Sequence, residues 1–184
     1  MNRIIFVSGP CGTGKSTFTD RYARHLVSES GKTVYVIHGD DFHAGFVEPE
    51  EKGDFFVNGE ASDIVRWEDI LRFNWDCIFA TADRALRQEI DVLIDYVIEE
   101  ELPRVRELAA AHNAKLYYIV LTAAEEELER RIRSRGDVDM IERAKFLKRK
   151  LDLLPENAGH IYDNTGKDPE RMIKEIDLDT YEVR

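Results

Sequence analysis

Short apolar runs alternate with longer amphipathic stretches along the chain, and this alternation predicts strands and helices in turn. Runs rich in β-branched and aromatic residues predict five strands, at residues 3–8, 33–38, 92–96, 116–121 and 160–163. The stretches between them predict helices at residues 15–30, 67–88, 99–112, 124–133, 140–153 and 168–176. This order predicts an α/β fold in one domain, residues 1–184, with a five-stranded parallel sheet and helices on both faces.

A glycine-rich loop directly follows the first predicted strand and reads Gly-Pro-Cys-Gly-Thr-Gly-Lys-Ser-Thr. It fits the pattern G-x-x-x-x-G-K-[ST], a phosphate-binding loop between a strand and a helix. The glycines allow a tight backbone whose N–H groups point at phosphate oxygens, Lys15 can reach the β- and γ-phosphates, and Ser16 can ligate Mg²⁺. We therefore predict a nucleoside triphosphate site. Its expected contacts are Gly9, Pro10, Cys11, Gly12, Thr13, Gly14, Lys15, Ser16 and Thr17.

Composition narrows the partners and the compartment. The chain has 184 residues, a hydrophobic content of 43% and a net charge of −11, so we expect neither nucleic acid nor a membrane as a partner. The two cysteines, Cys11 and Cys77, are far apart and lack metal-ligand spacing. We therefore expect no disulfide framework, which agrees with a reducing cytoplasm. No apolar run approaches the ~18 residues of a membrane span, and the N-terminus enters a strand at once, unlike a signal peptide. We expect a cytoplasmic protein.

Two adjacent carboxylates, Asp40 and Asp41, follow the second predicted strand. Ligands of parallel sheets gather at the carboxyl ends of the strands, so these groups suit a general base for an acceptor hydroxyl, or an Mg²⁺ shell. A turn that uses aspartate for its backbone hydrogen bonds is the alternative. We expect His43 to face the acceptor and His38 to pack within its strand, although both histidines could instead join the aspartates in a metal site.

The third predicted strand closes on Asp95 and Tyr96. An apolar run that ends on aspartate is typical of the second acidic element of phosphate-loop proteins, which orients Mg²⁺ or its waters, so Asp95 joins Ser16 as a predicted metal residue. Asp95 could instead contact the acceptor, together with Tyr96. Residues 45–66 form the longest irregular stretch, and we expect a flap over the acceptor there, within about residues 41–66, with Arg66 as an acceptor ligand.

Four arginines lie close together in the fourth predicted helix and just after it, and Arg131 and Arg135 share one helical face. Guanidinium groups on a lid, about residues 124–150, can neutralise charge that develops on a transferred phosphoryl group. A solvated helix face with Glu–Arg pairs is the alternative. After the last strand, the polar turn that contains Asn164 could line the edge of the base pocket or simply make a turn.

Taken together, these residues resemble the small P-loop kinases of the nucleoside-monophosphate-kinase-like group, which includes gluconate kinase, adenylylsulfate kinase, chloramphenicol phosphotransferase and the zeta-toxin kinases. The resemblance covers nearly the whole chain and implies a three-layer P-loop NTPase fold with an arginine-bearing lid, using ATP and Mg²⁺. Because several of these kinases carry an Asp-x-Phe base element, it implies Asp40 as the base, with Asp41 second. It also implies Arg131 and Arg135 as lid residues and Asn164 near the base.

We therefore expect a kinase that moves the γ-phosphoryl group of Mg-ATP to a hydroxyl of a metabolite, a nucleoside or sugar, or an antibiotic. One alternative is an ATPase or nucleotide-dependent switch without a small-molecule acceptor; another is a sugar-nucleotide kinase similar to the zeta toxins. A GTPase would want an Asn-Lys-x-Asp element, and the sequence has none. The flap contains no acceptor signature of a known member, so the acceptor stays open, as do the choice of ATP over GTP and the oligomeric state.

Overall fold

Five parallel strands form the centre of the protein in a computed structural model that describes residues 1–46, 56–57, 60–61 and 66–183. The sheet order is β2-β5-β1-β6-β7, which confirms the predicted α/β P-loop NTPase fold. The central strands read as nearly unbroken apolar runs because both faces of a parallel sheet are buried. The strands are β1 (Arg3–Ser8), β2 (Val34–His38), β5 (Asp91–Asp95), β6 (Lys115–Thr122) and β7 (Ile161–Asp163).

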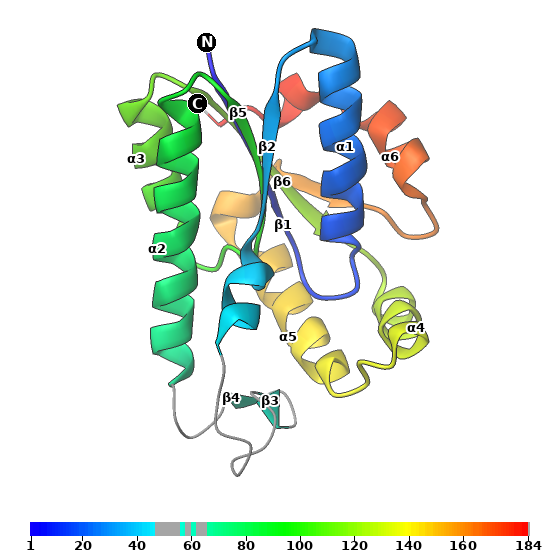
Figure 1. Ribbon diagram of the computed structural model, residues 1–184. Coiled ribbons are helices and arrows are strands. Elements are labelled where there is room, and N and C mark those ends of the chain that lie inside the picture. Colours follow the sequence, from blue (N-terminus) through cyan, green and yellow to red (C-terminus); the bar gives the residue numbers. More distant parts are fainter. Residues whose placement is uncertain (47–55, 58–59, 62–65, 184) are drawn as a thin grey trace.

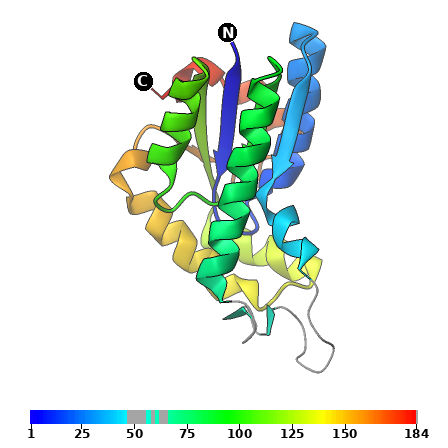
Figure 2. The same ribbon diagram turned by 60° about the vertical axis from the view of Figure 1, so that its left-hand side comes forward.

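Helices cover both faces of the sheet, as Figures 1 and 2 show. On one face lie α1 (Lys15–Ser30) and α6 (Pro169–Glu175), where Phe18 and Met172 join an apolar cluster with Val7. On the other face lie α2 (Trp67–Leu86), α3 (Leu102–Ala111) and the end of α5 (Met140–Leu153). There Trp75 stacks on Phe6 with ring centroids 5.7 Å apart. The sheet and the two helical layers that pack on it through these clusters form the three predicted layers.

Helix ends follow recognisable local signals. The Asp168 carboxylate accepts a hydrogen bond from the Arg171 N–H at 2.8 Å and caps α6, which begins at Pro169. The predicted start of α3 at residue 99 is wrong, because the helix begins at Leu102. The Glu101 carboxylate accepts the N–H groups of residues 99 and 100, at 3.0 Å each, and so closes a turn before the helix.

Several short elements complete the fold. Among the described residues, the 3-10 helices are η1 (Gly39–Gly45), η3 (Pro155–Asn157) and η4 (Leu178–Tyr181), and an antiparallel pair joins β3 (Phe56–Val57) to β4 (Glu60–Ala61). Most of the predicted flap lies outside the described residues. The remaining helix, α4 (Glu125–Arg135), packs against α5.

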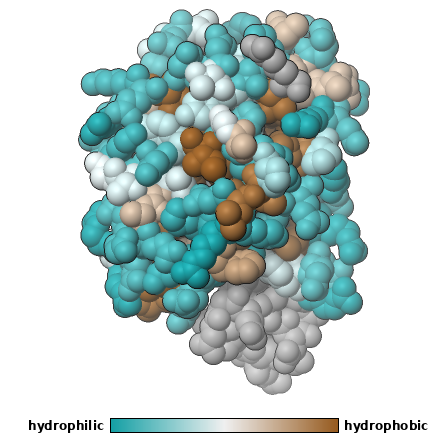
Figure 3. All heavy atoms as spheres, turned by 180° about the vertical axis from the view of Figure 1, so that it is seen from behind, coloured by the Kyte–Doolittle hydropathy of each residue, from teal (hydrophilic) through white to brown (hydrophobic). Residues whose placement is uncertain are grey.

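The carboxyl ends of the strands meet at one end of the molecule, the lower end in Figure 1, together with η1, α4 and the start of α5. Both chain ends lie at the opposite end. The face turned away in Figure 1 is largely hydrophilic, with small apolar areas near its middle (Figure 3). Because the predicted site residues follow the strand ends, they gather at the lower end. In the part of the chain that the structure describes, no helix is long and apolar enough to cross a membrane.

Candidate functional site

The phosphate loop is held against the sheet by its backbone. Gly9 has a φ of 140°, and a Cβ there would lie 2.3 Å from the Leu121 carbonyl oxygen of β6, so the position requires glycine. The Thr13 hydroxyl donates to the Pro10 carbonyl at 2.8 Å and closes the loop. Lys15 reaches back to the same carbonyl, with Nζ at 3.3 Å, and is 8% exposed. A loop of this shape, with a cation inside it, suits a bound phosphate chain.

A hydrogen-bonded row of four side chains joins α1 to the ends of β5 and β2; its members are Ser16, Asp95, His38 and Asp20. The Ser16 hydroxyl donates to Asp95 Oδ1 at 3.1 Å, and His38 Nδ1 lies 2.5 Å from Asp95 Oδ2. On its other side, His38 Nε2 lies 3.3 Å from Asp20 Oδ1. The structure thus brings together the two predicted metal residues. It also corrects the expectation that His38 merely packs within its strand.

Burial and charge act on this row in different ways. Burial raises the pKa of Asp95, against the opposing effect of His38 and Lys15. Partial burial disfavours the charged form of His38, but the carboxylates of Asp95 and Asp20 outweigh it and raise the pKa of His38. A proton is therefore retained between His38 and Asp95 at a higher pH than in the unfolded chain.

The predicted acceptor residues lie on η1 and just beyond β5. Asp40 and Asp41 are exposed on η1, and His43 Nε2 lies 3.6 Å from Asp40 Oδ1. On its other side, His43 Nδ1 forms a short hydrogen bond with Nδ2 of Asn74, and that Nδ2 also donates to the Tyr96 hydroxyl at 3.0 Å. Burial raises the pKa of Tyr96 to about 12, so its hydroxyl stays protonated near neutral pH.

Asn74 is the site residue that sequence reasoning missed. It is fully buried on α2 and lies four residues from both Ile70 and Ile78, which are also fully buried. Residues four apart share one face of a helix, so this spacing places the asparagine among inward-facing positions. A polar amide in the apolar row of α2 was the available signal.

Gly39 allows η1 to approach β5 closely. A Cβ at this position would lie 2.4 Å from Cδ2 of the Tyr96 ring. Phe42, half-buried, packs η1 against the apolar cluster on the α2 face of the sheet. Together these contacts set the position of the Asp40 backbone relative to Tyr96.

On the other side of the loop, Arg131 joins α4 to the phosphate loop and to the turn after β7. Its Nη1 donates to Asn164 Oδ1 at 3.1 Å and to the Gly12 carbonyl at 3.4 Å, and its Nη2 donates to the Asn164 carbonyl at 3.1 Å. Asn164 Nδ2 in turn donates to the Thr13 carbonyl at 2.7 Å. Arg130 and Arg131 lower the pKa of Glu127 to about 2. The α4 arginines therefore combine Glu–Arg pairs with loop contacts.

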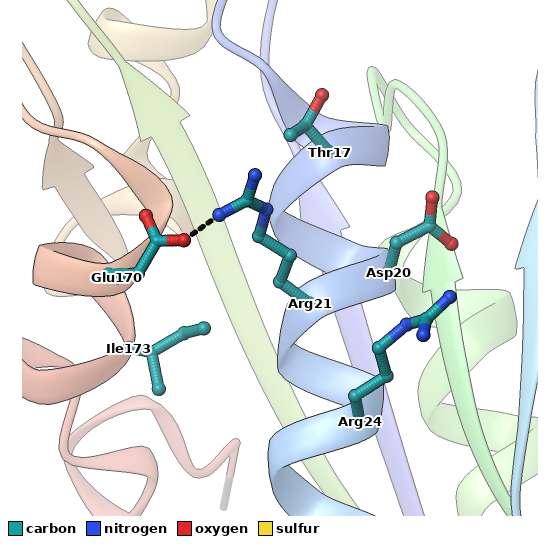
Figure 4. Close-up of a pocket in the computed structure, with 6 residues that line it drawn as sticks. All are labelled: Thr17, Asp20, Arg21, Arg24, Glu170 and Ile173. Atoms are coloured by element: carbon teal, nitrogen blue, oxygen red, sulfur yellow. Dashed lines mark ion pairs between the residues drawn. The ribbon is translucent and has the colours of Figure 1, made fainter.

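These contacts border a pocket of ≈ 460 Å³ between the phosphate loop, α4 and α6. Predicted residues that line it are Thr13, Gly14, Thr17, Arg131, Arg135 and Asn164. A second hollow, of ≈ 540 Å³, lies between α1 and α6 (Figure 4). There the side chains of Arg21 and Glu170 form an ion pair across the two helices, and Thr17 lines both hollows.

The remaining predicted residues lie at the edges of the site. Cys11 is half-buried and packs against the small cluster of Ile132, Ile141 and Ala144. Arg66 is exposed at the start of α2, with Nε 3.4 Å from Asp69 Oδ2. The next residue, Trp67, has its ring 6.0 Å from the His43 ring.

The two histidines of the alternative metal site have different partners, His38 with Asp95 and His43 with Asn74. Within the described ranges, no three His, Cys, Asp or Glu side chains are grouped to hold a metal ion among themselves. The donors that suit Mg²⁺ are the oxygens of Ser16 and Asp95, 3.1 Å apart beside the phosphate loop. Phosphate oxygens usually complete the shell of Mg²⁺ at such a site.

Fold and loop together define a P-loop NTPase. The chain belongs to the AAA domain family, whose sequence pattern matches residues 4–151. It is 26% identical over 180 residues to a guanylate kinase of Porphyromonas gingivalis, which covers 89% of this chain and 87% of that protein.

Solved kinases share the fold. The APS kinase CysC of Mycobacterium tuberculosis, solved with AMPPNP and APS, superposes with a TM-score of 0.64 at 16% identity, over 97% of this chain and 96% of that one. A gluconokinase from Sinorhizobium meliloti 1021 superposes with a TM-score of 0.58 at 20% identity, over 98% and 91%. The resemblance to the small P-loop kinases is thus confirmed at the level of the fold.

Proposed function

We propose that the protein is an ATP-dependent phosphotransferase that moves the γ-phosphoryl group of ATP to a hydroxyl of a small molecule. One observation carries the proposal: Asp95, the last residue of β5, and Tyr96, directly after it, contact two different groups of side chains. Asp95 contacts Ser16 at the phosphate loop, and Tyr96 contacts Asn74 beside His43 and Asp40. Because successive side chains of a strand point to opposite faces, the strand end holds a donor side and an acceptor side next to each other.

On the donor side, Lys15 and the loop N–H groups would hold the phosphates, and Ser16 and Asp95 would hold Mg²⁺. Bound Mg²⁺ neutralises charge on the β- and γ-phosphate oxygens. The pocket beside Arg131 and Asn164 would take the rest of the nucleotide. Arg131 and Arg135 belong to the proposed lid, residues 124–150, and would offset charge on the transferred group.

On the acceptor side, Asp40 would act as the general base. As the acceptor oxygen bonds to the γ-phosphorus, the bond from that phosphorus to the bridging oxygen of ADP breaks, and Asp40 takes the hydroxyl proton. The contact with His43 favours Asp40 over Asp41 in this role. His43, Tyr96, Arg66 and the flap are the proposed acceptor contacts.

The experiment follows label from [γ-³²P]ATP with Mg²⁺ into an extract of small metabolites and, in a separate reaction, into GMP. The wild type should label a hydroxyl-bearing compound. Lys15→Ala should abolish labelling and ATP binding, whereas Asp40→Asn should abolish labelling and leave ATP binding intact. Asp41→Asn, one position away and also exposed, is the matched control and should keep activity.

Three results would count against the proposal. Label released only as inorganic phosphate, at a rate that the extract does not change, would indicate an ATPase or switch. Label recovered as GDP in the GMP reaction would indicate a phosphate rather than a hydroxyl as acceptor, as the name of the Porphyromonas gingivalis relative suggests. Full turnover of Asp40→Asn would remove Asp40 as the base.

A further inference from the structure

A buried amide in the middle of α2 has no evident packing role. Asn74 is fully buried, and its neighbour Trp75 and the inward-facing Ile78 are apolar. Its Oδ1 is shielded from solvent and has no hydrogen-bond partner among the described residues, while its Nδ2 contacts both His43 and Tyr96. A buried polar atom without a partner is costly, so an apolar residue would suit this position better if packing alone mattered. The function of the amide therefore lies in its Nδ2 contacts.

The contact with His43 determines where the imidazole carries its proton. An amide nitrogen can only donate, so Nδ1 of His43 must accept from Asn74. A neutral imidazole that accepts at one nitrogen carries its hydrogen on the other, here Nε2. That nitrogen lies 3.6 Å from Asp40 Oδ1.

The opposite tautomer would turn a lone pair toward the carboxylate of Asp40 and repel it. The Asp40 side chain is 68% exposed, so without a donor beside it the carboxylate would move freely in solvent. His43, by contrast, is held by Asn74 from α2, and its ring centroid lies 6.0 Å from that of Trp67 and 6.4 Å from that of Tyr96.

We infer that Asn74 is a positioning residue: it holds His43 as the Nε2–H tautomer and so keeps an N–H group directed at Asp40. The inference deepens the proposed function and rests on it, because Asp40 matters as the base of phosphoryl transfer. Asn74 would touch neither nucleotide nor acceptor and would act on Asp40 only through His43. Loss of such support commonly lowers a rate by about 10- to 100-fold without affecting remote binding.

The first test needs no acceptor. Long-range ¹H–¹⁵N spectra of the ¹⁵N-histidine-labelled protein report the tautomer of each of its five histidines, and His43→Gln identifies the signals of His43. The wild type should show His43 as Nε2–H. Asn74→Asp is nearly isosteric but offers only acceptor oxygens when ionised, so His43 should then carry a proton on Nδ1.

Tyr96→Phe is the matched control, since it removes the other partner of Asn74 Nδ2 and should leave His43 as Nε2–H. Should Asn74→Asp not fold, Asn74→Ala takes its place and should give a mixture of tautomers. An Nδ1–H signal for His43 in the wild type, or an unchanged His43 signal after substitution of Asn74, overturns the inference.

The second test is a kinetic cycle of Asn74→Ala, His43→Leu and the double variant. Each single variant should lower kcat for phosphoryl transfer by about 10- to 100-fold and leave the KM for ATP unchanged. The double variant should be no slower than the slower single variant, because Asn74 acts through His43. If the two losses in kcat multiplied in the double variant, Asn74 would have a structural role separate from His43. If the wild type transfers no phosphoryl group to any hydroxyl, the proposed function fails, whereas the spectra still decide whether Asn74 sets the tautomer.

Discussion

His38 and Asp95 stand opposite each other at the last paired position of β2 and β5, and His38 Nδ1 lies 2.5 Å from Asp95 Oδ2. Strand register therefore supplies the buried carboxylate with a partner that carries a proton. The same carboxylate receives the Ser16 hydroxyl from the first turn of α1. The acidic element beside the phosphate loop is thus fixed from both sides by the sheet and a helix.

The His38–Asp95 pair should make stability depend on pH. Both pKa values are raised in the folded protein, so folding takes up a proton. The contribution of His38 is complete below the ordinary histidine pKa of about 6.5 and is lost as the pH rises through the higher folded value of His38. His38→Gln should therefore lower the free energy of unfolding more at about pH 6 than at about pH 9, as measured by urea denaturation.

His160 provides a control of opposite sign. Burial lowers its pKa, against the hydrogen bond from Nδ1 to the Tyr118 carbonyl at 3.0 Å. The folded state thus disfavours the charged imidazole, and its stability penalty appears as the pH falls below about 6.5. His160→Gln should cost less at about pH 5 than at about pH 8. If the free energies of unfolding of the two variants changed equally with pH, the opposite pKa directions assigned to His38 and His160 would be contradicted.

Ser16 should determine the Mg²⁺ concentration that phosphoryl transfer requires. Ser16→Ala should raise the Mg²⁺ concentration for half-maximal phosphoryl transfer by about 10- to 100-fold, because a ligand oxygen held by Asp95 is lost. Ser30→Ala, at the far end of α1, removes a bond to the Leu26 carbonyl and one from the Lys32 N–H, and should leave the Mg²⁺ titration unchanged. EDTA should stop transfer in every variant. An unchanged titration for Ser16→Ala would exclude the metal role.

Two glycines at the ends of η1 should respond differently to alanine. A Cβ at Gly39 would lie 2.4 Å from the Tyr96 ring, so Gly39→Ala should destabilise the protein by about 1–3 kcal/mol and reduce transfer by displacing η1. At Gly45 no heavy atom of the described residues, apart from its chain neighbours, lies within 4 Å of an added Cβ, so Gly45→Ala should be neutral, or stabilising by up to about 1 kcal/mol. Urea denaturation of both variants measures the difference.

Arg131 should matter to nucleotide binding more than its neighbours on α4. Arg131→Ala removes the bonds to Asn164 and to the loop carbonyls, and should lower stability by about 1.5–3 kcal/mol and weaken binding of a non-hydrolysable ATP analogue. Arg133→Ala removes only an exposed pair with Glu129 and should change neither by more than about 0.5 kcal/mol. Isothermal titration and urea denaturation test both; equal effects would contradict a special role for Arg131.

Local patterns were enough to predict most of the fold. The strands are apolar because both sheet faces are buried, and the phosphate loop is recognisable because its residues are contiguous. The 3-10 helix η1 could not be predicted, since it depends on contacts of Gly39 and Phe42 with residues far along the chain. The start of α3 was misplaced because a run of glutamates favours a helix, whereas the Glu101 carboxylate accepts the N–H groups of residues 99 and 100 and closes a turn there.

The site was predictable only where its parts are local in sequence. Asp40 and Asp95 follow strands and could be found by position, whereas the partner of His38 depends on which strands pair. Asn74 sits in an apolar row with Ile70 and Ile78, but its link to His43 spans 31 residues and needs the packing of α2 on η1. The flap expected over the acceptor, about residues 41–66, lies largely outside the described part of the chain.

Under the proposed function, Asp95 and Tyr96 mark the boundary between two halves of the protein. The proposed nucleotide half is built on β1, α1 and the α4 side, whereas Tyr96, η1 and the first turns of α2 form the proposed acceptor half. Grafting η1 and the start of α2 from a kinase of different specificity should change what is phosphorylated without retuning how ATP is held. Lengthening β5 by one residue before Asp95 should disrupt both halves at once, because it would exchange the sides that the two side chains face.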